Sequence, residues 1–290
     1  MGPYVSIPNL SDYRVPMTIY CRKTKAHIAE AEERFRTIQI AIDFFEEFFS
    51  CAFPFKKYDM VFVPEFRING MENVGVVIMR DTFMRPAEEK TFFEYQQWYK
   101  VAVHELSHMW FGDLVTMRWW NDLWLKESFA EYSTIVCLTE CQGFSYVKCP
   151  QQLGLHFLWE ALNDDTKRTT HPIQMTINHT NDANNMYDKI CYRKGACFLK
   201  QIDHFVGRDI MREGIKLYFR EFSFKTVVLQ DFINCLKKAL TLRLKPIDLQ
   251  QWVDSWLTKS GVNELDAVIE SKANGKFAIH ISQREPRNGD

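Results

Sequence analysis

Two histidines and a glutamate in the pentapeptide HELSH have the types and spacing of a metal site. His104 and His108 stand four residues apart, so on a helix both side chains project from the same face, one turn apart. Two neutral imidazoles held in this way can bind one Zn²⁺, and a third protein ligand leaves the fourth position for water. Glu105 is acceptor-only when ionised, which suits a base that takes a proton from that water. The pentapeptide therefore predicts a hydrolytic zinc site.

Glu127 is the candidate third ligand. It follows His108 after 18 intervening residues and lies in WLKESFAEY, a second amphipathic run that predicts a helix. If this helix crosses the first, it can present the Glu127 carboxylate to the metal. We therefore expect one Zn²⁺ per chain, bound by His104, His108 and Glu127. The alternative for the pentapeptide alone is an exposed helix with two satisfied histidines.

The longer segment HELSHMWFGDLVTMRWWNDLWLKESFAEY resembles the zinc-binding segment of the aminopeptidase N family. These gluzincin metallo-aminopeptidases also include leukotriene hydrolase. The resemblance implies a zinc-dependent hydrolase that removes N-terminal residues from peptides. Lys126 and Ser128 depart from the pattern, since the family more often has Asn and Gly there, and Lys126 places a cation next to a metal ligand.

The segment NGMEN, residues 69–73, is the candidate substrate-binding segment. The free α-amine of a peptide is a cation, so holding it beside the metal requires a fixed anion, and Glu72 can supply it. Backbone groups around Gly70 and Met71 could pair with an extended substrate. The segment is similar to the family's exopeptidase motif G-A/G-M-E-N, with Asn69 in place of the first Gly, which implies substrate-binding roles for Gly70, Met71, Glu72 and Asn73. The alternative is a turn glycine beside a solvated acid.

Tyr192 in ICYRKGA is the candidate donor for the oxyanion of the tetrahedral intermediate. By residue type alone it would be a packed ring with its hydroxyl at the surface. It matches the family's Y-x-K-G motif, which implies that the phenol stabilises the intermediate. The HPI tripeptide at residues 171–173 also looks like family sequence, and we interpret it as scaffold. Asp122 and Glu131 are candidates to hydrogen-bond the histidines.

The elements that must position these residues follow from apolar periodicity. The chain predicts an α+β fold, mostly helical with a small β-sheet lobe, and the resemblance implies a thermolysin-like zinc metallopeptidase catalytic domain. Helices are predicted at residues 25–50, from 86 to the end of HELSH, and at 124–140, 151–162, 193–207, 209–222, 229–240 and 246–261. Strands are predicted in residues 1–25 and at 58–64, 73–80, 265–271 and 277–283, with the last two joined by a turn at Asn274-Gly275.

Three regions are expected along the chain. Residues 1–24 are either the end of a preceding β-rich domain or lead-in strands, residues 25–261 form the catalytic domain, and residues 262–290 are the first strands of a following β module. In the resembled family a β-rich domain precedes the catalytic domain and a large helical domain follows it. We therefore expect that N- and C-terminal domains of a parent enzyme are missing here.

Composition narrows the classes of partner. With 46% hydrophobic and 25% charged residues the chain is an ordinary globular protein, and its net charge of −1 does not favour nucleic acid as a partner. Eight cysteines without a CxxC pair indicate thiols of a reducing compartment, so we expect the cytoplasm. We find neither a leader peptide nor an apolar run long enough for a transmembrane segment.

The leading hypothesis is an aminopeptidase acting on peptides with a free N-terminus. Glu72 and Glu127 would hold the α-amine, Glu105 would move the proton from water to the leaving amine, and Tyr192 would stabilise the oxyanion. One alternative is an epoxide hydrolase of leukotriene-hydrolase type, which needs a deep apolar pocket. Another is a catalytically silent fragment of a multidomain aminopeptidase that acts as a binding module.

Overall fold

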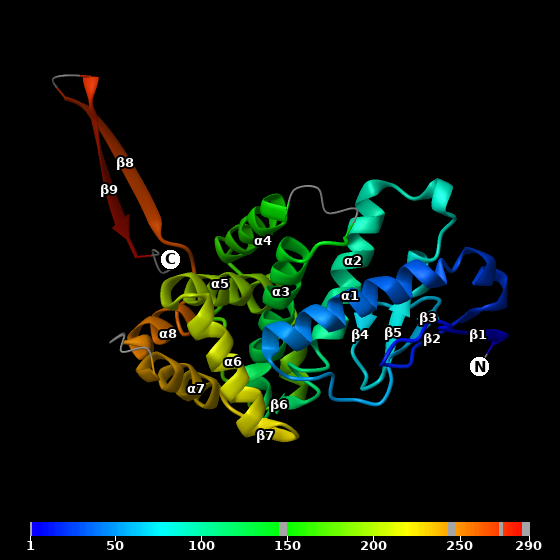
Figure 1. Ribbon diagram of the computed structural model, residues 1–290. Coiled ribbons are helices and arrows are strands. Elements are labelled where there is room, and N and C mark those ends of the chain that lie inside the picture. Colours follow the sequence, from blue (N-terminus) through cyan, green and yellow to red (C-terminus); the bar gives the residue numbers. More distant parts are fainter. Residues whose placement is uncertain (1, 145–149, 243–247, 273–274, 286–290) are drawn as a thin grey trace.

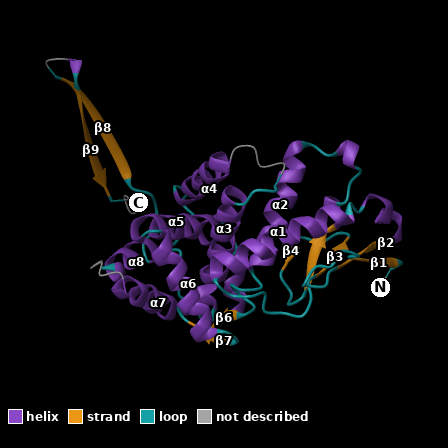
Figure 2. Ribbon diagram, viewed as in Figure 1, coloured by secondary structure: helices purple, strands orange, loops and turns teal. Residues whose placement is uncertain are grey.

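The computed structural model describes residues 2–144, 150–242, 248–272 and 275–285. A β-sheet lobe lies at one end, helices fill the middle and the other end, and a hairpin projects from the helical end (Figures 1 and 2). The α-helices are α1 (Ala31–Phe49), α2 (Phe92–Ser107), α3 (Leu123–Glu140), α4 (Pro150–Asp165), α5 (Gly195–Val206), α6 (Arg208–Phe222), α7 (Leu229–Leu242) and α8 (Leu249–Leu257). The strands are β1 (Tyr4–Pro8), β2 (Thr18–Arg22), β3 (Asp59–Val63), β4 (Gly70–Met71), β5 (Val76–Arg80), β6 (Val115–Met117), β7 (Lys225–Val227), β8 (Glu264–Ser271) and β9 (Phe277–Arg284). The predicted mostly helical α+β fold is confirmed.

The lobe is a mixed sheet with the order β1-β2-β3-β5-β4 in the described part of the chain. Strands β2, β3 and β5 run parallel, while β1 and β4 pair antiparallel with β2 and β5. In β2 and β5, buried and half-buried side chains alternate, because successive side chains of a strand point to opposite faces of the sheet. Strand β4 forms the edge of this sheet, so one side of its backbone is left without a neighbouring strand among the described residues.

Helix α1 packs an apolar stripe against α2, α3 and α6. Its buried residues recur at helical spacing, from Phe35 through Ile38 and Ile42 to Phe49. The helix begins at Ala31 and not at the predicted Lys25, because residues Lys23–Ile28 form a 3-10 helix and Glu30 has a φ of 43°. A left-handed backbone at that position interrupts the helical hydrogen bonds.

Helix α2 carries the HELSH pentapeptide at its C-terminal end. A capping box starts it, in which the Thr91 hydroxyl accepts from the Glu94 amide and the Glu94 carboxylate accepts from the Thr91 amide. The prediction that this helix begins at Pro86 is wrong, because residues Ala87–Glu89 form a separate 3-10 turn. His108 is the C-cap and keeps right-handed helical dihedrals, so the spacing of the two histidines is preserved.

Helix α3 is the central helix and packs against α1, α2, α4 and α5. Its residues Leu123–Leu138 are all buried except Lys126, which is half-buried. The prediction of an amphipathic helix is therefore wrong here, since neighbouring helices cover every face. Glu127 lies on this helix, so its backbone is held in place by packing on all sides.

An aromatic core lies beneath the pentapeptide. Phe111 stacks on Phe129 with ring centroids 4.2 Å apart, and Phe49 and Phe219 contact Phe111 from α1 and α6. Large aromatic side chains bury much area and prefer these stacked or edge contacts. This core joins α1, α3 and α6 to the loop after α2.

The C-terminal half agrees with the predicted helices. Helices α5, α6, α7 and α8 follow in order, and a short parallel pairing of β6 with β7, which periodicity did not predict, ties the loop after α2 to the end of α6. Strands β8 and β9 pair antiparallel as the predicted hairpin. The predicted turn residue Asn274 lies outside the described residues, and Gly275 has the positive φ of 72° that favours glycine.

Candidate metal centre and active site

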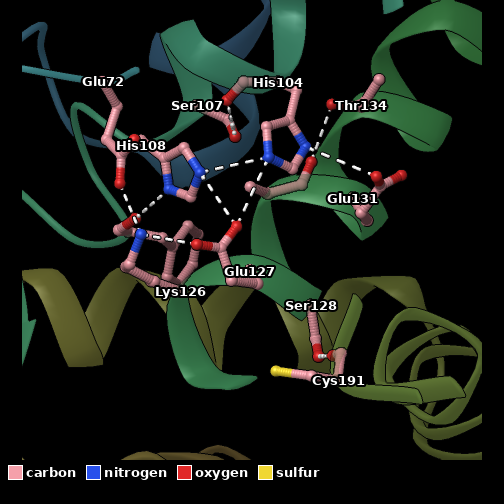
Figure 3. Close-up of polar contacts among 12 residues, drawn as sticks. Glu72, His104, Ser107, His108, Lys126, Glu127, Ser128, Glu131, Thr134 and Cys191 are labelled. Atoms are coloured by element: carbon pink, nitrogen blue, oxygen red, sulfur yellow. Dashed lines mark hydrogen bonds and ion pairs between the residues drawn. The ribbon is translucent and has the colours of Figure 1, made fainter. Parts of the chain in front are cut away.

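Three predicted ligands converge where α2 meets α3 (Figure 3). The Nε2 atoms of His104 and His108 are 3.2 Å apart, and each lies within 3.5 Å of Oε2 of Glu127. His108 and Glu127 are almost fully buried, with 1% and 2% exposure. Helix α2 presents the two imidazoles from one face, and α3 crosses close enough to add the carboxylate, as the sequence predicted.

The spacing of these atoms fits zinc. Ligand atoms 2.0–2.1 Å from a tetrahedral Zn²⁺ lie about 3.3 Å from one another. The three observed separations, 3.2, 3.4 and 3.5 Å, agree with the edges of such a tetrahedron. Two nitrogens and one oxygen are also a donor set that zinc accepts, and they leave one corner for water or substrate.

Groups around the ligands orient them. Nδ1 of His108 lies 2.9 Å from the Phe111 carbonyl oxygen, which makes Nδ1 the donor and leaves the Nε2 lone pair for a metal. Oε1 of Glu131 lies 3.7 Å from Nδ1 of His104, so this predicted partner is placed beside its histidine. Asp122, the other candidate, instead accepts from Gln174 Nε2 and the Leu229 amide, because it sits at the start of α3 and faces α7.

When no metal is bound, the charged side chains of this cluster shift one another's pKa values. Burial alone would lower the pKa of His108, but the carboxylates of Glu72 and Glu127 outweigh it and raise that pKa to about 9. Burial opposes the ionised form of Glu127 too, yet Lys126 and His108 lower its pKa well below the ordinary value. At neutral pH the metal-free cluster therefore holds a charged imidazole against ionised carboxylates.

Zinc affinity is expected to rise with pH. A histidine must lose its proton to bind metal, so affinity will increase about tenfold per pH unit between pH 7 and 9 and level off above the His108 pKa. Competition with a chromogenic chelator at each pH measures this. In Glu72→Gln, which lacks the carboxylate that most raises this pKa, the plateau will begin at a lower pH. Equal pH profiles for the two proteins would contradict this account.

Glu105, the predicted base, sits against Gly70. The carboxylate is buried, and burial raises its pKa to about 7, although the charges of the nearby histidines act to lower it. A Cβ on Gly70 would lie 2.6 Å from Cγ of Glu105 and closer still to its carboxyl group, so only glycine leaves room there. Ligand atoms of Glu72, Glu105 and His108 all lie within 4.8 Å of one another.

Glu72 immediately follows the edge strand β4 and points toward the ligands (Figure 3). Burial would raise its pKa, but His108 and Lys126 lower it to about 2, so it is an anion at all physiological pH values. The Lys126 ammonium donates to Glu72 and, at 2.5 Å, to Oε1 of Glu127. The structure thus places an anion beside the predicted metal ligands, with a lysine already paired to it.

Tyr192 lies on the other side of the cluster, in a π-helix at Ile190–Lys194. Such single-turn bulges often carry functional side chains. Its ring is parallel to that of His104 with centroids 6.1 Å apart. Burial and the neighbouring Glu127 carboxylate raise the pKa of Tyr192 above its ordinary value, so the phenol keeps its proton and can donate.

The π-helix is anchored at both ends. Asp188 caps its start by accepting from the amides of Ile190 and Cys191, and His171 lies 2.7 Å from the same carboxylate. His171 is the first residue of the HPI tripeptide, which accordingly acts as scaffold for the segment that carries Tyr192. At the other end Lys194 pairs with the buried Asp165 at 2.7 Å.

Gly195 lets the π-helix approach α3. A Cβ there would lie 2.8 Å from Cβ of Ser128 and closer to its hydroxyl, which donates to the Cys191 carbonyl at 2.6 Å. The glycine of the Y-x-K-G motif is thus needed for close packing. Ser128, a departure from the resembled pattern, adds a hydrogen bond between the helix of Glu127 and the segment of Tyr192.

Some expected roles remain predictions, and some residues were missed. Met71 lies on β4, and the exposed Asn73 accepts from the Val76 amide in the turn before β5; neither is brought into contact with the metal ligands. Asp113 was missed: burial raises its pKa to about 7, and its Oδ2 is buried without a hydrogen-bond partner among the described residues. The Phe111 carbonyl was missed because a backbone group leaves no mark in the side-chain pattern.

Comparisons with known proteins agree with this arrangement. A family profile described as the peptidase family M1 domain matches residues 34–256, which is more than half of the chain. The chain is 37% identical to aminopeptidase N of Streptomyces lividans over 96% of its own length and 33% of the relative. It is 29% identical to leucyl aminopeptidase of Saccharolobus solfataricus, over 93% of its length and 34% of the relative, and 29% identical to glutamyl aminopeptidase of Bos taurus, over 88% and 26%. The chain thus spans between a quarter and about a third of the length of these relatives. In the part of the chain that the structure describes, no helix combines the length and apolarity needed to cross a membrane.

Proposed function

The chain belongs to peptidase family M1, and on that basis we propose that it is the thermolysin-like catalytic part of a zinc aminopeptidase that removes N-terminal residues from peptides. The observation that carries the proposal is the ionised Glu72, whose carboxylate lies within 4.8 Å of ligand atoms of both Glu105 and His108. An endopeptidase has no use for a buried anion at this place, whereas an exopeptidase needs one for the α-amine.

We propose that His104, His108 and Glu127 bind one Zn²⁺ as cofactor. When bound, the ion would polarise the scissile carbonyl and lower the pKa of a water molecule. Glu105 would accept the proton of the attacking water on its carboxylate and later give it to the leaving amine. The Tyr192 hydroxyl would donate to the oxyanion of the tetrahedral intermediate, for which its high pKa keeps the proton in place.

We propose that β4 and the turn after it position the substrate. The free edge of β4 offers the backbone groups of Gly70 and Met71 to an extended peptide, in the manner of strand addition. Glu72 would then receive the α-ammonium, and Asn73 would hold the turn that fixes Glu72. A peptide bound in this way can extend only in the C-terminal direction, which defines an aminopeptidase.

The proposal is tested by hydrolysis of aminoacyl-fluorogenic substrates with and without a zinc chelator. The best substrate is compared with its N-acetylated copy, which has no α-ammonium for Glu72. Turnover that the chelator abolishes and that fails on the acetylated copy supports the proposal. Turnover of the acetylated substrate at a similar rate would rule out an aminopeptidase. Bound zinc without turnover would instead indicate the silent binding module.

Tyr192→Phe is expected to lower kcat by roughly 10²–10³-fold, because one oxyanion donor is lost and the ring is kept. Zinc content and stability will stay close to wild type, since the hydroxyl is not among the metal ligands. Steady-state kinetics together with zinc quantification measure both effects. Tyr187→Phe is the matched control, because its ring packs against Tyr192 but its hydroxyl has no proposed role. Equal loss in both variants would argue against the oxyanion role.

The other two hypotheses receive less support. The relatives reported above are named as aminopeptidases, which gives no support to an epoxide substrate. A silent module would be expected to have lost one of the residues proposed as ligand, base or oxyanion donor, and this sequence has all of them.

The domain limits and the compartment also remain proposals. We propose residues 25–261 as the catalytic domain, residues 1–24 as lead-in strands or the end of a preceding domain, and residues 262–290 as the first strands of a β module. The hairpin β8–β9 exposes apolar side chains on both faces, which suits strands that further domains would cover. The free thiols of the described cysteines suit a cytoplasmic location.

A further inference from the structure

Lys126 lies in the substrate subsite that the proposed function defines. Its ammonium donates to Oε1 of Glu72 and to Oε1 of Glu127, and its side chain is only 13% exposed. An ammonium paired with Glu72 beside the metal ligands is what the α-amine of a bound peptide would be. We propose that Lys126 occupies the α-ammonium subsite when no substrate is bound, and that it sets substrate affinity by competing for Glu72. This inference rests on the proposed aminopeptidase function.

The two oxygens of Glu127 have separate partners. Oε2 faces the Nε2 atoms of His104 and His108, whereas Oε1 faces Lys126. The lysine therefore leaves the oxygen that faces the histidines free for a metal. At Glu72 the situation is different, because Lys126 pairs with the very carboxylate that the α-amine needs (Figure 3).

Gly112 lies against the stem of Lys126. Gly112 has a φ of 128°, and a Cβ there would lie 3.4 Å from Cδ of Lys126 and 3.5 Å from Nδ1 of His108. The loop after α2 thus packs directly along the lysine stem without a side chain of its own. Since Lys126 immediately precedes Glu127 on the buried helix α3, its backbone is held as firmly as that of the ligand.

The lysine and the α-ammonium of a substrate would share the Glu72 carboxylate. The groups that face Lys126 are Glu72, Glu127 and His108, with Asp113 and Glu105 further into the cluster. A substrate α-ammonium would bring a second cation to Glu72, and like charges at that distance repel. We therefore expect the lysine to weaken binding of the amine, and a movement of its ammonium out along the flexible stem would relieve this repulsion.

The test is binding of a non-reacting pair of probes to the metal-free protein by titration calorimetry. The probes are L-leucinamide and 4-methylpentanamide, which differ only in the α-amine. Lys126→Met keeps most of the stem and removes the charge, and Lys126→Gln serves as a second variant if the first does not fold. Lys57→Met, on a lysine paired with Asp59 in the sheet lobe, is the matched control.

We expect Lys126→Met to bind L-leucinamide at least tenfold more tightly than wild type, with unchanged affinity for 4-methylpentanamide and no effect of Lys57→Met. In the zinc-loaded enzyme the KM for aminoacyl substrates will fall by a similar factor. Unchanged or weaker binding of L-leucinamide, with Glu72→Gln still weakening it, would overturn the competitor role and leave the aminopeptidase proposal standing. No preference for the amine in any variant would overturn both.

Discussion

Glu105→Gln is expected to lower kcat/KM by roughly 10²–10⁴-fold while zinc stays bound. Glutamine keeps the shape of the buried side chain but cannot accept a proton from water. His104, His108 and Glu127, which would bind the metal, are unchanged, so zinc stoichiometry and affinity will stay near wild type. Steady-state kinetics and metal analysis of the same preparation separate the two effects. Glu88→Gln, in an exposed turn before α2, is the matched control and should match wild type.

A second measurement on the Glu105 variant does not depend on turnover. Burial raises the pKa of Glu105 from 4.5 to about 7, so the metal-free folded state binds this proton more tightly than the unfolded state does. The ionised carboxylate therefore destabilises the fold progressively from pH 4.5 to 7. Glu105→Gln should be more stable than wild type above pH 7, by up to about 3 kcal/mol, and equal to it below pH 4.5.

The role of Glu105 as base is tested by the kinetic measurement alone. In that measurement, a kcat/KM of Glu105→Gln within tenfold of wild type would contradict this role.

Gly70→Ala is expected to have the second large effect, on stability and on activity together. The new methyl group would meet the Glu105 carboxyl group, and overpacking of this kind costs about 1–3 kcal/mol. Because a displacement of the base by about 1 Å can cost roughly 10²-fold in rate, kcat should fall by that order even in the folded fraction. Urea unfolding and steady-state kinetics measure the two effects.

Two further variants make the Gly70 prediction specific. Gly154→Ala in α4 is the control, since its Cβ would meet only the mobile end of Lys200, and alanine favours a helix by about 1 kcal/mol over glycine. In the double variant Gly70→Ala with Glu105→Ala the clash partner is absent, so the stability loss should be smaller than the sum of the two single losses. Additive losses would show that the methyl group strains something other than Glu105.

The local pattern of the chain was enough to predict that two histidines could bind one metal ion. The i, i+4 spacing of His104 and His108 determines that their imidazoles share a helix face, and no tertiary contact is needed for that. Apolar periodicity likewise predicted the helices of the C-terminal half and most strands of the lobe, because each element buries one face. It did not predict the two-residue strand β4. It misjudged α3, whose neighbours cover all of its faces, since periodicity reports one-sided burial only.

Tertiary structure alone decided which distant residues share the site. The distance from Glu127 to the histidines depends on the crossing of α2 and α3, and the approach of Glu72 depends on the edge position of β4. Neither relation is encoded in spacing along the chain. The same holds for the need for glycine at position 70, because the side chain that excludes a Cβ comes from another element, 35 residues later.

The pairing of Lys126 with Glu72 most clearly separates what the sequence determines from what the tertiary structure decides. The sequence shows a cation next to a metal ligand, which by itself indicates a local change in charge. Only the fold brings Glu72, 54 residues earlier, within reach of that ammonium. Coulombic interactions depend on distance in space and on burial, whereas a sequence records only order, so residue types determine what chemistry is available and packing decides which groups take part in it.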